Sequence, residues 1–307
     1  MSVAQDSSPA ERVSTPVDGV DVLGAISPSR AADFMSCPLL YRFRTIDRLP
    51  EPYSVDAVRG TLVHKVLEDL FELPAPERTP EQARDMLVPT WEQLMDAEPG
   101  LAELFIEADG PVFLDWLTSC WDVLDRYFSL EDPRRLEPAE RELYVETLLP
   151  SRLLLRGFVD RVDVAPDGAI RVVDYKTSRS PSEAFEAKAL FQMKFYALAI
   201  WRIRGVVPSM LQLIYLGNAE MLRYVPDEAD LRATERKIEA VWQAIRLAEE
   251  TGDWRPSPSK LCDWCAHKAI CPAWGGTPPP IPAREPRGTD SAGDVEIDEG
   301  VTTAGLG

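Results

Sequence analysis

Apolar residues recur along the chain with two different periods, and these periods divide the chain into helices and strands. Helical spacing of three and four residues marks an amphipathic helix over residues 55–72. Ser27-Pro28 predicts the start of a short helix that ends near Cys37. Further helices are predicted over residues 80–96, 111–129, 182–204 and 228–250. Runs rich in Val, Leu and Ile predict strands at residues 142–149, 153–164, 170–176, 210–216 and 220–225.

The order of these elements predicts the fold class. Helices come first, then two strands joined by a turn at Asp167-Gly168, then a crossover helix and two more strands. We therefore expect an α/β fold with a mixed central sheet flanked by helices. Residues 1–22 and 278–307 lack periodic apolar positions, so we expect two disordered tails around one domain at residues 23–277. Within that domain, a helical insertion is expected at about residues 73–135 and a cysteine segment at residues 255–275.

The charge of the chain limits what it can bind. The formal net charge is −18, to which residues 1–22 contribute −3 and residues 283–307 contribute −4, so −11 belongs to the body. Phosphate contacts need Lys and Arg, and any nucleic-acid surface must therefore be a local basic groove on an acidic protein. No apolar run approaches the roughly 20 residues of a membrane span, and the N-terminus lacks the apolar core of a signal peptide. We therefore expect a cytoplasmic protein.

The predicted strands at residues 153–164 and 170–176 carry charged residues, which are unusual in apolar, buried strands. Asp174 and Lys176 are two residues apart on one strand, so their side chains share a face. If the turn at Asp167-Gly168 pairs the strands, Asp160 approaches Asp174 from the side. Like charges repel in a low dielectric and a divalent cation removes that penalty, so we expect Mg²⁺ or Mn²⁺ there, with Lys176 beside the attacking water. The structural alternative is an ion pair on an exposed strand face.

Weaker candidates lie on two of the predicted helices. His64 is one of only two histidines, and Glu68 follows it by one turn on the helix at residues 55–72. Gln192 and Tyr196 lie four residues apart and share a face of the helix at residues 182–204. Each also has a structural interpretation: His64 as a core or surface histidine, Glu68 as a solvated neighbour, and Tyr196 as a packed ring with its hydroxyl at a rim.

Three of the five cysteines form the pattern C-x2-C-x5-C: Cys262, Cys265 and Cys271. Clustering of this kind in a long chain indicates a metal site rather than disulfides. Three thiolates leave one ligand position of a four-ligand site open, and Cys37 is the candidate for it. Cys120 lies in an apolar helix and is interpreted as a buried thiol. Spacing alone leaves open Zn²⁺, a [4Fe–4S] cluster and unligated core cysteines. His267, between the ligands, is interpreted as a surface residue.

Four motifs occur in the order found in RecB-family nucleases of the PD-(D/E)xK superfamily, and the chain resembles that family. They are Gly60…His64, Gly157-Phe-Val-Asp160-Arg-Val-Asp163, Asp174-Tyr-Lys176-Thr177 and Gln192…Tyr196. The resemblance covers residues 27–272 and extends to the nuclease domains of bacterial helicase–nucleases and to CRISPR-adaptation nucleases. It implies a restriction-endonuclease-like fold with an N-terminal helical region and a C-terminal cysteine-cluster segment.

The same resemblance implies a role for each motif residue. His64, Asp160 and Asp174 would ligate the metal, with the backbone carbonyl of Tyr175 as a further ligand, and Lys176 would be the catalytic lysine. Gln192 and Tyr196 would position the DNA strand or the active-site groups, and Asp163 would support the hairpin. Nucleases of this family that hold a cluster take one cysteine from before the nuclease core and three from after it. The resemblance therefore favours [4Fe–4S] over Zn²⁺ at Cys37, Cys262, Cys265 and Cys271.

These observations predict a hydrolase, namely a Mg²⁺- or Mn²⁺-dependent exonuclease that prefers single-stranded DNA or DNA ends and serves DNA repair or recombination. Tyr41, Phe43 and Phe191 are compatible with base stacking. The chain has no Walker-type motif, so any unwinding would come from a helicase partner. The acidity favours an alternative, a non-catalytic nucleic-acid-binding or scaffold subunit of a helicase–nuclease complex. A redox protein that uses only the cysteines would leave the two aspartates and the lysine without a role.

Overall fold

The computed structural model describes residues 22–106, 112–180 and 183–282, without the side chains of residues 183–186. The strands are β1 (Gly24–Ile26), β2 (Glu140–Leu148), β3 (Leu153–Val164), β4 (Ile170–Lys176), β5 (Met210–Tyr215) and β6 (Glu220–Tyr224). The α-helices are α1 (Pro28–Ser36), α2 (Pro38–Tyr41), α3 (Val55–Leu70), α4 (Pro80–Ala97), α5 (Phe113–Leu130), α6 (Glu183–Arg204) and α7 (Glu228–Thr251). Short helical turns follow α2 (the π-helix η2, Arg42–Ile46) and form much of the cysteine segment (η6, Lys260–Asp263; η7, Lys268–Ile270; η8, Pro272–Trp274). The predicted tails lie almost wholly outside the described residues.

Local sequence signals explain where the helices begin and end. Ser27 caps α1, with its hydroxyl accepting a hydrogen bond from the Arg30 N–H, and Asp227 caps α7 in the same way. Gly252 ends α7 in the left-handed conformation (φ 70°) that glycine adopts without strain. Among the described residues, no helix combines the length and the apolar character that crossing a bilayer requires.

The six strands form one mixed sheet in the order β1-β3-β4-β5-β6, with β2 paired to the other edge of β3. β1 and β5 run parallel to their neighbours β3 and β4, and the remaining pairs are antiparallel. The predicted pairing of residues 153–164 with residues 170–176 is confirmed. The sequence reading missed β1, whose three residues are too few to show an alternating pattern.

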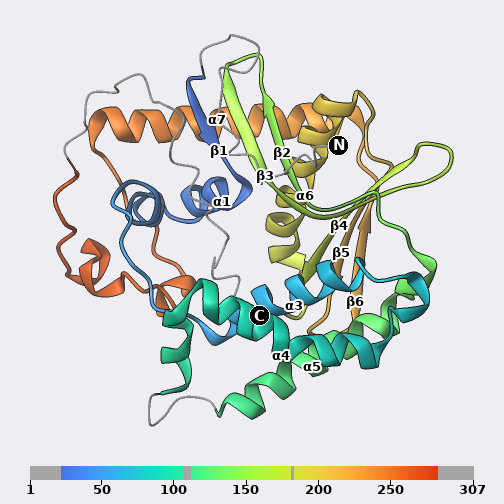
Figure 1. Ribbon diagram of the computed structural model, residues 1–307. Coiled ribbons are helices and arrows are strands. Elements are labelled where there is room, and N and C mark those ends of the chain that lie inside the picture. Colours follow the sequence, from blue (N-terminus) through green and yellow to red (C-terminus); the bar gives the residue numbers. More distant parts are fainter. Residues whose placement is uncertain (1–21, 107–111, 181–182, 283–307) are drawn as a thin grey trace, which may run out of the picture.

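Helices cover both faces of the sheet, which confirms the predicted α/β class (Figure 1). Successive residues of β4 and β5 alternate between two cores: Val172 and Leu213 pack with α6 and α7, whereas Val173 and Ile214 pack with α3, α4 and α5. This alternation follows from the period of two along a strand, and it explains why β4 reads as a continuous apolar run. Each residue of the central strands therefore belongs to one layer only.

β3 parts from its neighbours near its middle, and this separation positions the candidate site. One edge of β3 pairs with β2 almost throughout, from Leu154 to Val162. The other edge pairs with β1 only through Leu155 and with β4 only from Arg161 onward. Between these two ladders, residues 156–160 face a gap in the described sheet. Asp160 occupies the last position of the gap, at the fork where β3 and β4 separate.

Arg161, next in sequence to Asp160, anchors the fork from the opposite face. Its side chain is 1% exposed and forms a bidentate pair with Glu131, at 2.9 and 3.1 Å. It also contacts Asp163 and donates to the Tyr175 hydroxyl at 2.5 Å. Asp163 in turn accepts a hydrogen bond from Arg171 on β4, at 2.8 Å. This network joins β3 and β4 on the face that does not carry Asp160.

We predict that Arg161→Met lowers the free energy of unfolding by about 3–5 kcal/mol, because it removes the cation that pairs with the buried Glu131 carboxylate at two positions, whereas Asp163 keeps Arg171. Arg232→Met is the matched control: Arg232 pairs with Glu228 on the exposed face of α7, and its loss should cost less than about 0.5 kcal/mol. Urea unfolding of both variants measures the difference. Equal stability of the two variants would contradict the anchoring role of Arg161.

Candidate active site

Asp160 is held at the fork by a backbone hydrogen bond. The Tyr175 N–H donates to its Oδ2 at 2.7 Å, and the same oxygen lies 3.5 Å from Nδ1 of His64. Both polar backbone groups of a strand residue leave the same edge, so the Tyr175 carbonyl also faces the Asp160 side. The side chain of Tyr175 points to the other face, towards Arg161. Asp160 thus keeps a carboxylate oxygen at a point where a backbone carbonyl and an imidazole converge.

Asp174 and Lys176 lie on the same face of β4, as their spacing predicts. Lys176 Nζ is 2.8 Å from Asp174 Oδ2 and donates to Oε1 of Gln192 at 3.0 Å. The Gln192 amide donates to Oδ1 of Asp174 at 3.2 Å and lies 3.3 Å from the Tyr196 hydroxyl. One helical face of α6 therefore holds both charged groups of β4. Gln192 links the ammonium to the carboxylate, and Tyr196 extends this polar chain into the core.

Gly157 is required because Tyr196 packs against β3. A Cβ atom at this position would lie 3.0 Å from the Tyr196 ring and 3.4 Å from Pro28. A larger residue would push the ring, and with it the end of the hydrogen-bonded chain, away from β3. The glycine in the motif is thus explained by the close approach of α6.

His64 reaches the fork from α3, on the other side of the sheet. Its ring packs edge-on against Tyr175, with 6.0 Å between centroids, and its side chain is 28% exposed. Glu68, one turn later, forms an ion pair with Lys65 at 2.9 Å and lines the same small pocket as His64, Glu142 and Asp160. The helix therefore supplies an imidazole in reach of Asp160 and a carboxylate beside it.

Glu142 is the residue that sequence reasoning missed. β2 and β3 pair in a register that sets Glu142 directly across from Asp160, since Arg141 faces Arg161 and Leu143 faces Val159. Its backbone has a positive φ of 40°, which non-glycine residues rarely adopt and which often marks a functional position. The sequence did contain a signal for this pairing. If residues 142–149 and 153–164 form a hairpin with its turn at Ser151, residues 142 and 160 are equally far from the turn and face each other.

The described residues contain one group of three side chains that could hold a metal ion: His64, Glu142 and Asp160. Their ligand atoms all lie within 4.8 Å of one another. Asp174, which the sequence resemblance adds to the ligands, lies outside this group, because Lys176 and Gln192 engage its oxygens. Hard carboxylate oxygens and one imidazole nitrogen form a donor set that suits a divalent cation. The residues present therefore fit a metal at the fork.

Electrostatics show that the site carries more negative charge than it can stabilise alone. Burial, followed by the charges of Asp160 and Glu68, raises the pKa of Glu142. Burial raises the pKa of Asp174 too, and Asp160 adds to this while Lys176 opposes it. Burial alone would lower the pKa of Lys176, but Asp174 and Asp160 outweigh it and raise the pKa, so the lysine stays protonated. A divalent cation would relieve this repulsion.

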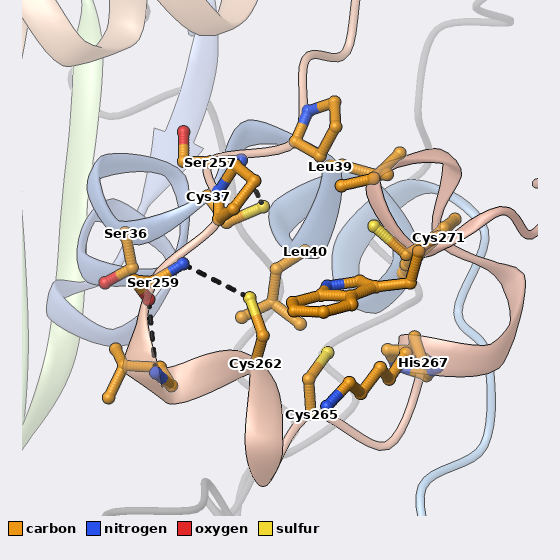
Figure 2. A pocket seen from close by; sticks show the side chains of 17 residues that line it. Ser36, Cys37, Leu39, Leu40, Ser257, Ser259, Cys262, Cys265, His267 and Cys271 are labelled. Carbon is orange, nitrogen blue, oxygen red and sulfur yellow. Dashed lines mark hydrogen bonds between the residues drawn. The ribbon is translucent and has the colours of Figure 1, made fainter.

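The four predicted cysteine ligands line one pocket, together with Ser36, Leu40 and His267 (Figure 2). Cys37 lies at the end of α1, and the other three come from the C-terminal segment beside it. Two backbone N–H groups, of Ser257 and Ser259, donate to the sulfurs of Cys37 and Cys262 at 3.4 Å. Among the described residues, however, no three sulfurs lie within 4.8 Å of one another, so the thiols are not gathered around the position of a single ion. Cys120 is fully buried, as expected, and burial raises its pKa to about 12.

His267 is not the surface residue that the sequence suggested. Its side chain is 5% exposed, and its Nε2 lies 2.8 Å from Oε1 of Glu51. Glu51 also pairs with Arg44, whose other nitrogen contacts Asp33. Burial raises the pKa of Glu51, but His267 and Arg44 outweigh this and hold it at about 2. Spacing between cysteines could not reveal this, because the partners come from the N-terminal part of the chain.

The aromatic residues proposed for base stacking are also not available at the surface. Tyr41, Phe43 and Phe191 are 3%, 2% and 6% exposed. Tyr41 stacks on Trp254 in the core, and Phe43 packs against His267. That part of the sequence interpretation was wrong, because apolar residues next to a predicted site are more often core residues than ligand contacts.

Comparison with known proteins identifies the family and the fold. The family model of the PD-(D/E)XK nuclease superfamily matches residues 25–272. The Gene 69 protein of Mycobacterium phage D29 is 27% identical over 281 residues, which cover 81% of this chain and 96% of that protein. The Gene 69 protein of Mycobacterium phage L5 is 28% identical over 123 residues, covering 39% of this chain and 40% of that protein.

A solved structure from Eubacterium rectale, named as a candidate exonuclease, has the same fold. It superposes with a TM-score of 0.52 at 14% identity and covers 99% of this chain and 100% of its own. At this level of identity the similarity concerns the fold.

We predict that Glu142→Gln raises the melting temperature of the metal-free protein near pH 8 and reduces the further rise on adding Mn²⁺. Because the folded-state pKa of Glu142 is raised, its ionisation favours unfolding, so the gain should grow as pH rises above the ordinary glutamate range and vanish at roughly pH 4. Each 1 kcal/mol corresponds to about 2–4 °C in a chain of this size. Glu140→Gln, on the same strand and face, is the control and should change neither quantity. A metal-free Glu142→Gln protein that melts below wild type would contradict this account.

Proposed function

The chain belongs to the PD-(D/E)XK nuclease superfamily, and we propose that it is a RecB-like, Mg²⁺- or Mn²⁺-dependent deoxyribonuclease. In this proposal it hydrolyses DNA phosphodiesters as an exonuclease that prefers single strands or ends, in DNA repair or recombination. The observation that carries the proposal is the convergence at the fork of Asp160, Glu142 and His64 beside the Asp174–Lys176 pair. A merely structural ion pair on an exposed strand would not need two carboxylates and an imidazole within 4.8 Å of one another beside it.

Each residue of the site would have a separate task in this reaction. Asp160, His64 and Glu142 would hold the divalent ion, with Asp174 and the Tyr175 carbonyl as further ligands. The bound metal would supply Lewis-acid activation of water and of the scissile phosphate. Lys176, kept protonated by Asp174, would donate to the attacking water or to a phosphate oxygen and offset the charge that develops there. In this role Lys176 is a protonated hydrogen-bond donor that stabilises negative charge, and it is not a general base.

Gln192 and Tyr196 would position these groups rather than react. Gln192 accepts from Lys176 and donates to Asp174, so it fixes the distance between the ammonium and the carboxylate. Tyr196 is almost fully buried and supports the Gln192 amide, and burial raises its pKa well above the ordinary tyrosine range. A phenol of this kind stays neutral and keeps its hydrogen bond at any pH at which the enzyme would work.

The cysteine pocket supports the further proposal that Cys37, Cys262, Cys265 and Cys271 hold a [4Fe–4S] cluster. Tetrahedral zinc would draw four sulfurs to within about 3.8 Å of one another, given its bond length of about 2.3 Å. All four thiols line one pocket, and a group that they share would occupy it. N–H groups that donate to Cys37 and Cys262 are the contacts that stabilise ligating thiolates. Such a cluster would join residues more than 200 positions apart in the chain.

A non-catalytic role as a nucleic-acid-binding or scaffold subunit is the second candidate, and the net charge of −18 favours it. An acidic protein binds DNA weakly without a basic partner. In either role the chain would depend on a helicase partner for unwinding. The two candidates differ in metal-dependent cleavage, which only the first produces.

We predict that the purified protein degrades single-stranded DNA with Mn²⁺, and that Asp174→Asn or Lys176→Ala lowers the rate by at least about 100-fold. Asp174 would help to hold the metal and keeps Lys176 protonated, and Lys176 would offset the charge of the transition state. Gel assays on end-labelled oligonucleotides measure the rate and the polarity. Asp167→Asn, in the exposed turn between β3 and β4, applies the same chemical change outside the site and should leave the rate unchanged. Cleavage at the wild-type rate by either site variant would remove the assigned active site.

A separate prediction concerns the cysteine pocket. Cys37→Ala and Cys265→Ala should each abolish the visible absorbance of an iron–sulfur protein, release iron and acid-labile sulfide, and lower the melting temperature. Cys120→Ala is the matched control, because this thiol is buried between helices away from the pocket and its loss should keep the absorbance. Zinc in metal analysis of the wild type, or absorbance retained in Cys265→Ala, would exclude the cluster.

A further inference from the structure

The cysteine segment presents two large aromatic side chains to solvent. Trp264 is 69% exposed and Trp274 is 51% exposed, although tryptophan is normally highly buried. Apart from its backbone, Trp264 has no ring or hydrogen-bond contact in the described part of the chain. The segment thus exposes apolar ring area that its own packing does not use.

Basic residues lie near the two rings along the chain, and one of them contacts the Trp274 ring. Lys268 Nζ lies 4.4 Å from the centroid of the Trp274 ring and 2.8 Å from Asp263, the residue before Trp264. Lys260 is exposed on the turn that leads to Trp264. Residues 255–276 carry three basic groups against Asp263 alone, a local charge of +2 on a chain of net charge −18. We refer to Lys260, Trp264, Lys268 and Trp274 as the tryptophan–lysine surface.

This surface is linked to the fork through α6. Lys188 lies one turn before Gln192 on α6, and its Nζ is 3.4 Å from the hydroxyl of Ser36. Ser36 in turn lines the pocket formed by the cysteine segment. An extended strand that leaves the site near Gln192 would therefore meet the Lys188 ammonium and then the cysteine segment.

We propose that the tryptophan–lysine surface binds single-stranded nucleic acid, with a base stacked on Trp264 and phosphates beside Lys260 and Lys268. The proposal deepens the nuclease assignment and rests on it for the direction of the strand. An aromatic face flanked by ammonium groups matches the alternation of bases and phosphates along a single strand. A duplex keeps its bases stacked on one another and cannot use the ring face, so the surface selects unpaired strands.

The test is equilibrium binding of a fluorescein-labelled oligothymidylate to the protein as purified, without added divalent metal so that no cleavage occurs. Trp264→Ala should weaken binding roughly 5- to 100-fold, the loss expected for one stacked base, and should leave binding of a duplex of the same length unchanged. Trp264→Phe should retain most of the affinity. Leu114→Ala removes a comparably exposed apolar side chain (68% exposed) from α5 and serves as the control.

Lys260→Ala tests the phosphate contact independently of the ring. It should reduce the slope of log affinity against log salt concentration by about 0.7, the value for one phosphate contact on a single strand. Arg246→Ala on the exposed face of α7 removes a similar charge and should leave the slope as in the wild type.

The outcomes separate this proposal from the nuclease assignment. Wild-type affinity in Trp264→Ala, or an equal loss for single strands and duplexes, would overturn the stacking surface even if cleavage occurs. A wild type that binds oligothymidylate through Trp264 but never cleaves it would overturn the nuclease assignment and leave the surface in place. Unchanged absorbance and melting temperature of Trp264→Ala establish that a lost affinity is not a loss of fold.

Discussion

Repulsion among buried carboxylates at the fork between β3 and β4 is the constraint on which the rest of the structure depends. Glu142 and Asp160 meet there with ligand atoms within 4.8 Å of each other, Asp174 lies on the neighbouring strand β4, and burial raises the pKa of both Glu142 and Asp174. Sheet pairing sets them there and does not let them move apart, because Glu142 faces Asp160 across the β2–β3 ladder. Lys176 offsets part of the charge of Asp174, and the Tyr175 N–H donates to Asp160. Protonation of Glu142 or a bound divalent cation would relieve the remaining repulsion.

Successive residues of a strand point to opposite faces of the sheet, so the repelling carboxylates and the ion pairs that stabilise the fold lie on different faces. Asp160 faces the site, and Arg161, the next residue, points to the opposite face, where it pairs with Glu131 and Asp163. Tyr175 alternates in the same way between Asp174 and Lys176, with its backbone serving Asp160 and its hydroxyl serving Arg161. The stabilising ion pairs of Arg161 and the candidate site residue Asp160 therefore lie on opposite faces of β3, although His64 reaches Asp160 from the side of α3. The positive φ of Glu142 lies between two pairs of the β2–β3 ladder on one side and six pairs on the other, which hold the backbone in place.

The sequence predicted well what depends on local period, and poorly what depends on register or packing between distant segments. The bounds of β3 and β4 and the shared face of Asp174 and Lys176 follow from alternation alone. Glu142 was missed because its place opposite Asp160 depends on the register of a hairpin whose turn was not used. His267, Tyr41, Phe43 and Phe191 were assigned to the surface or to stacking, but each is buried by a partner far away in the chain. Such contacts join residues far apart in the chain, so a local sequence pattern cannot reveal them.

The join between the N-terminal helices and the cysteine segment resolves the conflict between an acidic chain and a polyanionic substrate. Arg44, Glu51 and His267 form a buried polar network that docks the segment through protein groups alone, whatever the pocket of cysteines holds. This network places the cysteine segment, which is locally basic, near α6. The same helix carries Gln192, which lies at the fork. Long-range electrostatic attraction between the protein and a nucleic acid would contribute little, because the whole chain is negatively charged. If the chain binds nucleic acid as proposed, the binding would come instead from short-range contacts, namely stacking and a few phosphate pairs, and such contacts would favour a flexible single strand over a rigid duplex.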